Sequence, residues 1–196
     1  MSSRSDSREK MIKAGRRLYS TRGYVGTAFS DVLAESGAPR GSVYFHFPGG
    51  KDEFAGEVIT AHSRSENARV TRLAATCDTP REVVIAFLTA ARDHAVSTRF
   101  REGCPIGAVI VESSHTSPAL FASAATAIET SIDTLAALLV ERGATEPDAR
   151  RWAIAAVTGF EGALVVSRAM DDPAPFNALI ELLQQTMDPD RTHTTT

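Results

Sequence analysis

The sequence predicts an all-α protein, and three observations support this prediction. Apolar residues recur at helical spacing along nearly all of the 196 residues, and no clear run alternates apolar and polar residues as a half-buried strand does. Glycine or proline separates the periodic segments. The apolar fraction of 43% is ordinary for a globular protein with a core. We therefore expect about nine helices.

Three helices are expected in the N-terminal quarter. Gly23 and Gly37 end the first two, because glycine readily adopts the left-handed turn that closes a helix. Pro39 is tolerated at the start of the third, where its missing N–H would have no helical partner. The expected ranges are 7–23, a second helix from Thr27 or Ser30 to Ser36, and 40–46.

The remaining helices include several longer ones. A polar rod with a thin apolar stripe is expected over residues 51–76, and it has the character of a connector. A fifth helix follows the cap at residues 78–80, and a ninth opens at Pro173. Between them we expect helices over residues 106–113, 117–142 and 146–170.

The charge is distributed unevenly along the chain. Residues 1–51 contain nine Lys or Arg and four Asp or Glu, which gives +5, and because the whole chain carries −3, residues 52–196 carry −8. A basic end on an acidic body suits a polyanion such as DNA. A solvated basic helix would give the same count.

Other classes find little support in the sequence. No apolar run approaches the roughly 20 residues that cross a bilayer, and the N-terminus is polar, so a cytoplasmic protein is expected. Cys77 and Cys104 lack metal-ligand spacing and are expected to be packing thiols, with no metal or cofactor. Residues 112–115 lack nucleophile-elbow glycines, so we expect no enzyme.

Residues 27–47 form two short helices joined by a glycine turn, the arrangement that places a recognition helix in the major groove. This segment, with the alanine, leucine-aromatic and glycine pattern over 14–23 and Lys51 to Phe54, closely resembles the headpiece of TetR-family regulators. Two residues depart from the family pattern: Pro39 stands where the family commonly has Ser or Thr, and Phe45 stands where it often has Tyr. The turn at 48–50 and the segment 103–108 resemble the branch of lincomycin-resistance and flavonoid-responsive repressors.

The resemblance implies two domains and a set of DNA contacts. We expect a helix-turn-helix domain over residues 1–50, a ligand-binding and dimerisation domain over 51–190 with helix 51–76 as connector, and a disordered tail over 191–196. Arg40 suits a guanine edge or a phosphate, and Gly41 allows close approach of the backbone. The expected DNA-binding residues are Thr27, Arg40, Gly41, Ser42, Tyr44, His46 and Lys51.

Three of these residues have structural alternatives. Thr27 caps the second helix either with or without a phosphate at the N–H groups. His46 either contacts the sugar-phosphate backbone, as the resemblance implies, or packs between helices beside its phenylalanine neighbours. Lys51 is either a phosphate clamp, as the resemblance implies, or a solvated lysine.

Specific operator binding normally requires two half-sites read by a symmetric dimer. The last two helices are the candidates for a four-helix interface like that of the family, and an internal core stripe is the alternative. The expected interface residues are Ala155, Gly159, Ala163, Leu179, Leu182 and Leu183.

A small-molecule site is expected between the fifth and eighth helices, mainly from the resemblance. Aromatic and apolar residues there suit a pocket, although ordinary core packing explains each one as well. Glu112 either orients a polar ligand or is solvated. The expected ligand-binding residues are Phe87, Ile106, Val109, Glu112, Phe121, Trp152 and Phe160.

The sequence thus predicts a homodimeric repressor that binds a double-stranded DNA operator and is released by a small-molecule inducer. A helical carrier of small molecules with an incidental basic end is the main alternative, and salt-dependent retention on DNA distinguishes the two.

Overall fold

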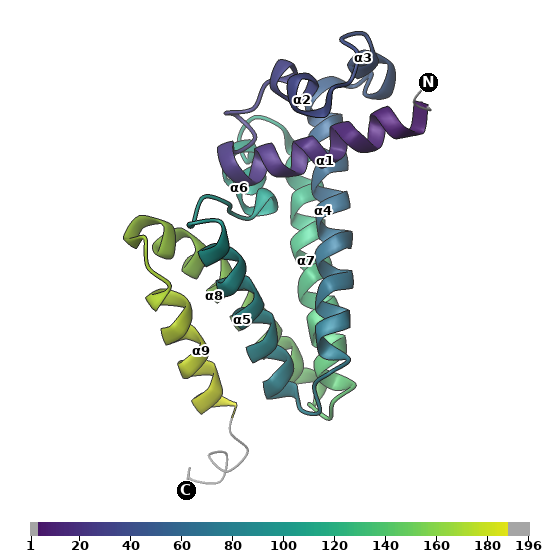
Figure 1. The fold of residues 1–196 in the computed structure, drawn as a ribbon. Helices are drawn as coiled ribbons and strands as arrows, with labels where there is room; N and C mark the ends of the chain where they lie inside the picture. The colour runs from purple at the N-terminus through teal and green to yellow at the C-terminus, as the bar shows by residue number, and fades with distance from the viewer. Residues whose placement is uncertain (1–3, 188–196) are drawn as a thin grey trace, which may run out of the picture. The chain divides into compact units, whose positions relative to one another are not determined.

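Residues 4–187 are described by the computed structural model, and within that range the chain forms nine helices and no strands (Figure 1). The predicted all-α class is confirmed. The predicted disordered tail at 191–196 lies outside the described residues. The helices are α1 (Arg4–Arg22), α2 (Phe29–Ser36), α3 (Ser42–His46), α4 (Gly50–Ala74), α5 (Pro80–Ser97), α6 (Pro105–Ser113), α7 (Pro118–Val140), α8 (Glu146–Met170) and α9 (Ala174–Thr186).

Glycine ends three helices as predicted. Gly23, Gly37 and Gly143 have φ values of 74°, 66° and 97°, in the left-handed region that glycine adopts without steric cost. The third helix is shorter than predicted and begins at Ser42 rather than Arg40. The reason is a tight turn in which the Ser42 N–H donates to the Pro39 carbonyl at 2.9 Å.

The chain divides into two compact units, the first of which comprises residues 1–65 and 102–129. In this unit α1 packs against α2 and α6. Its core is one apolar cluster with contributions from α1 to α4, α6 and α7, and Tyr19, Phe47 and Phe54 are its largest fully buried side chains. The unit therefore contains the predicted recognition helix together with the supports that hold it.

The second unit comprises residues 66–101 and 130–196, and in it α5, α8 and α9 pack against one another (Figure 1). Thr79 caps α5 as predicted, since its side chain accepts a hydrogen bond from the Glu82 N–H at 3.2 Å. Arg142 donates to the carbonyls of Ala74 and Cys77 at 2.6 and 3.1 Å, which satisfies acceptors at the C-terminal end of α4.

The expectation that no segment is long and apolar enough to cross a bilayer was wrong on length and composition. Both Pro118–Val140 and Glu146–Met170 pass that test, and 28% of the most apolar window of each helix is buried within the chain. Neither helix contains a long uninterrupted apolar run, because Thr and Ser occur within both, but these short polar residues lower the mean hydropathy only a little. Much apolar surface on these helices is therefore left uncovered by the chain itself.

Candidate nucleic-acid interface

An aromatic cluster in the first unit holds α3 in place. The ring of Phe54, on α4, lies 4.9 Å from Phe47, 5.5 Å from Phe29 and 6.0 Å from Tyr19, measured between centroids. These separations are typical of edge-to-face and tilted aromatic pairs. Phe47 is the residue that caps the C-terminal end of α3, so this packing fixes where the helix ends.

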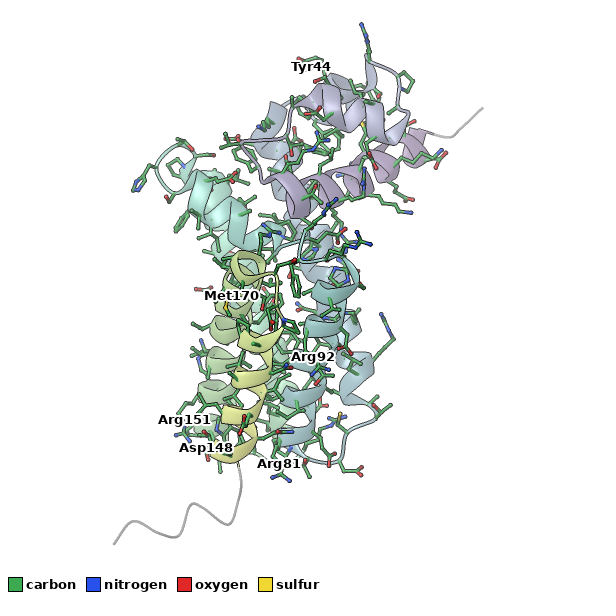
Figure 2. All side chains as sticks on the ribbon, turned by 60° about the vertical axis from the view of Figure 1, so that its left-hand side comes forward. Tyr44, Arg81, Arg92, Asp148, Arg151 and Met170 are labelled. Carbon is green, nitrogen blue, oxygen red and sulfur yellow. The ribbon has the colours of Figure 1, made fainter. Side chains whose placement is uncertain are left out.

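One side of the recognition segment is open to solvent. Arg40, Gly41, Tyr44 and Phe45 are exposed, whereas Val43 is buried in the core. Tyr44 and Phe45 are 72% and 64% exposed, and Figure 2 shows Tyr44 on the outside of the headpiece. Among the described residues, Arg40 has no ion-pair partner. Its guanidinium is therefore available to a base edge or a phosphate.

Two predicted contact residues already have partners inside the unit. The Ser42 hydroxyl donates to the Pro39 carbonyl at 2.6 Å. The half-buried His46 ring lies edge-on to Phe45 with centroids 5.0 Å apart, which fits the packing alternative for this histidine. Both arrangements give these side chains a structural role within the unit.

Thr27 does not cap α2, and that part of the prediction was wrong. The N-cap residue is Ala28, whose N–H donates to the Asp31 carboxylate at 2.9 Å. Thr27 is 1% exposed, and its hydroxyl donates to the Gly23 carbonyl at 2.8 Å. The side chain therefore closes the turn between α1 and α2, because its hydroxyl reaches back toward α1 rather than forward.

Lys51 lies in a cluster at the start of α4. Its ammonium group is 4.4 Å from the centroid of the Tyr24 ring and 3.5 Å from the Val25 carbonyl oxygen. Burial lowers the pKa of Lys51, and the nearby carboxylates of Glu112 and Asp52 partly oppose that effect. A phosphate clamp at this position would have to compete with these contacts.

The neighbouring Asp52 ties α4 to two other segments. Hydrogen bonds from the hydroxyls of Ser117 and Tyr24 stabilise its carboxylate and lower the pKa of Asp52. For Tyr24, burial and the same hydrogen bond raise the pKa to about 12, so the phenol stays protonated and continues to donate at neutral pH.

Glu112 on α6 contacts the turn between α1 and α2. Its carboxylate accepts a hydrogen bond from the Val25 N–H at 2.6 Å. Gly23 allows this approach, since a Cβ at that position would lie 2.4 Å from a Glu112 carboxylate oxygen. The sequence could not reveal the contact, because 87 residues separate its partners. Glu112 thus holds a structural hydrogen bond and is not simply solvated.

Ion pairs neutralise part of the basic N-terminal segment. Arg17 pairs with Glu35, and Arg22 lies 3.5 Å from Asp31, so two arginines of α1 face acidic residues of α2. Both pairs are partly exposed and so contribute modestly to stability. The net charge of +5 already counts these two carboxylates, so the pairs leave it unchanged and show which arginines face an acidic partner.

The predicted interface residues on α8 and α9 differ in exposure. Leu182 is 60% exposed, whereas Ala163 and Leu183 are buried within the chain. A Cβ on Gly159 would lie 2.7 Å from the side chain of Leu179, so these two residues contact each other inside one protomer. Ala155, the remaining predicted interface residue, is half-buried.

The predicted ligand-binding residues divide between the two units. Phe87 and Phe160 contact each other in the second unit with centroids 5.6 Å apart, and Trp152 packs against the same core. Ile106 and Val109 are buried in the core of the first unit, where Glu112 and the 37% exposed Phe121 also lie.

The comparisons with known proteins agree with this arrangement. The family described as "Bacterial regulatory proteins, tetR family" matches residues 11–58, and "Transcriptional regulator LmrA/YxaF-like, C-terminal domain" matches residues 80–181. The HTH-type transcriptional regulator LmrA of Bacillus subtilis (strain 168) is 31% identical over 170 residues, which cover 87% of this chain and 90% of LmrA. The HTH-type transcriptional regulator Rv0196 of Mycobacterium tuberculosis (strain ATCC 25618 / H37Rv) is 32% identical, covering 87% of this chain and 88% of that protein.

Solved structures show the same fold. A TetR transcriptional regulator from Chloroflexus aurantiacus J-10-FL superposes with a TM-score of 0.79 and 27% identity, covering 95% of this chain and 96% of that one. A TetR regulator from Legionella pneumophila has a TM-score of 0.81 with 19% identity, covering 92% and 96% of the two chains. The chain belongs to the TetR family of helix-turn-helix transcriptional regulators, which are not enzymes, and its C-terminal domain is of the LmrA/YxaF-like type.

Proposed function

We propose that the protein is a cytoplasmic, ligand-responsive repressor that binds a palindromic operator as a homodimer and is released by a small aromatic or drug-like molecule. The observation that carries the DNA-binding part is the exposed side of the recognition segment. There Arg40, which has no ion-pair partner among the described residues, and the exposed Tyr44 lie on the recognition segment, whose helix α3 is fixed from behind by the aromatic cluster.

DNA binding is tested by in vitro selection from random duplexes, followed by measurement of Kd at several salt concentrations. We expect a palindromic consensus and a wild-type affinity that falls steeply with salt. Arg40→Ala should weaken specific binding at least tenfold, since a bidentate guanine contact contributes about 1–3 kcal/mol in each half-site. Arg81, an exposed arginine on α5, is the matched control, and Arg81→Ala should leave Kd unchanged. Failure to enrich any duplex would favour the small-molecule carrier.

The dimer proposal rests on an exposed apolar side of α8. Ile154 and Val165 are 43% and 69% exposed, and because eleven residues make three helical turns they share one face. Val166 and Met170 on α8 are also exposed, at 46% and 56%, and Leu182 is an exposed side chain on α9. An apolar surface of this kind marks an interaction site, and a second copy of α8 and α9 would form the four-helix interface typical of the family.

Sedimentation velocity at micromolar concentration tests the dimer. We expect wild type to sediment as a dimer and Val165→Asp as a monomer, because a carboxylate at the centre of an apolar interface loses hydration without gaining a partner. Val96, which is 46% exposed on α5, is the matched control, and Val96→Asp should remain dimeric. A wild-type monomer would refute this part of the proposal.

The ligand part is supported by the aromatic content of the second unit. Phe87 and Phe160 contact each other, and Phe100 and Phe176 belong to an adjoining cluster with Phe160. In the described part of the chain the buried hydroxyl of Ser167 has no hydrogen-bond partner, so a polar group is available beside apolar surface. An apolar site with few polar groups suits a small aromatic molecule.

Release from DNA requires that the ligand favour a conformation with low operator affinity. A 100-fold loss of affinity corresponds to about 2.7 kcal/mol of coupling. We infer that α6 and α4 transmit this coupling to the DNA-binding helices. Glu112 on α6 accepts a hydrogen bond from the turn between α1 and α2, and Asp52 on α4 accepts one from Ser117. Planar aromatic compounds that raise Tm should then be titrated into the operator complex, and an operator Kd that is unchanged at saturation rejects induction.

A further inference from the structure

The exposed side of the recognition segment contains a side chain that cannot form hydrogen bonds. Phe45 is 64% exposed, while its helical neighbours Val43 and Phe47 are 1% and 0% exposed and form core. Burial in the core, which accounts for Val43 and Phe47, therefore does not account for the phenylalanine at position 45. The ring lies edge-on to His46, with centroids 5.0 Å apart and an interplanar angle of 82°, so a neighbouring residue braces it.

Open space lies one helical turn before this ring. Gly41 is exposed and in the right-handed helical region, and a Cβ built on it would meet nothing within 4 Å. Residues four apart lie on the same side of a helix, so the bare backbone of Gly41 and the ring of Phe45 are adjacent. A flat apolar group can therefore approach the backbone there and contact the ring.

Among the base edges of the major groove, the C5-methyl of thymine is the apolar group. We propose that Phe45 reads the C5-methyl group of a thymine in each half-site, so that this position of the operator is specified by apolar contact rather than by a hydrogen bond. This inference rests on the proposed DNA-binding function. In this proposal the exposed Arg40 and Tyr44 of the same segment make the polar contacts with the operator.

The experiment replaces single thymines by deoxyuridine in a duplex selected by the full-length protein. This change removes only the methyl group and keeps every base-pairing and groove hydrogen-bonding atom. We expect one thymine per half-site at which wild-type affinity falls about fourfold, and about fifteenfold when both half-sites are changed. Phe45→Ala protein should bind the thymine and deoxyuridine duplexes equally.

Tyr44→Phe is the matched control, since it changes a neighbouring exposed ring and removes only a hydroxyl. It should weaken binding to both duplexes by the same factor and keep the sensitivity to deoxyuridine. Both side chains are mostly exposed, so unfolding is not expected, and thermal melts of each variant check this. The proposal is overturned if no thymine is sensitive, or if Phe45→Ala retains the fourfold discrimination. A failed selection would instead refute the DNA-binding function itself.

Discussion

Replacing Gly15 with alanine should destabilise the protein, although helix propensity alone predicts the opposite. Gly15 lies within α1, where alanine is favoured over glycine by about 1 kcal/mol. The Cβ atom would lie 2.6 Å from Cζ of Phe54 and 2.6 Å from Cγ2 of Val58. Carbon atoms pack best at about 3.5–4.0 Å, so each contact is short by about 1 Å. Both neighbours are fully buried and have little room to move.

The net effect is worked from these two opposing terms. Overpacking of a core costs about 1–3 kcal/mol, and after the gain in propensity we expect a loss of about 1–2 kcal/mol. Gly56 on α4 is the matched control, because a Cβ there would meet nothing within 4 Å and Gly56→Ala should gain about 0.5–1 kcal/mol. For a chain of this length, Tm should fall by about 5 °C for Gly15→Ala and rise by about 2 °C for Gly56→Ala.

Calorimetry and urea titration measure both variants under one set of conditions. Because Phe54 contacts Phe47 at the end of α3, Gly15→Ala should also weaken operator binding, whereas Gly56→Ala should not. The close packing of α1 on α4 would be refuted if the two variants were stabilised to the same extent.

Three further changes test the cluster between the turn after α1 and the start of α4. Glu112→Ala removes the acceptor of the Val25 N–H, so amide exchange at that residue should accelerate severalfold, and Glu129→Ala, which lacks such a contact, should leave it unchanged. Asp52→Asn should lower Tm at pH 7, and the difference from wild type should shrink as pH falls below 3.8, because the pKa of Asp52 is depressed in the folded state and its stabilising contribution is lost as the carboxylate becomes protonated. Lys51→Met should reduce the salt slope of DNA binding by about one per protomer if it clamps a phosphate, and an unchanged slope with a lower Tm would assign it a structural role.

The sequence was sufficient to predict the fold because each helix has a local stop. Gly23, Gly37 and Gly143 end helices where the pattern predicted, and Thr79 caps α5. The ends that were misplaced depend on hydrogen bonds that no pattern specifies. The start of α3 moved to Ser42 because residues 39–42 close a turn first.

The sequence could not predict which side chains form hydrogen bonds with residues far away along the chain. Glu112 was interpreted as a ligand-orienting or solvated residue, yet it bonds a backbone N–H 87 residues away. Thr27 has the composition of a helix cap, but its hydroxyl bonds the preceding turn instead. Phe45 departs from the tyrosine that is frequent in the family, but its 64% exposure, on which the proposed apolar contact rests, depends on how the helices pack and is not given by the sequence.

The side of α8 that faces the core could not be assigned from periodicity, because this helix is apolar on both sides. Ala153, Ala156 and Ala163 are buried, while Ile154 and Val165 are exposed. A hydrophobic stripe identifies the inner face only when the other face is polar. The same composition explains why α8 resembles a membrane span by length and hydropathy, and why the proposed dimer surface has shifted from Gly159 and Ala163 to their exposed neighbours.

The geometry of Glu112 makes the proposed coupling sensitive to small movements. The carboxylate lies 2.6 Å from the Val25 nitrogen, and a hydrogen bond is weak beyond about 3.2 Å, so a displacement of α6 by about 1 Å would break it. α6 falls within residues 80–181, which match the C-terminal domain, and Val25 falls within residues 11–58, which match the DNA-binding domain. The bond thus joins the two matched domains inside one compact unit, and a ligand that displaces α6 would release the turn that precedes α2 and α3.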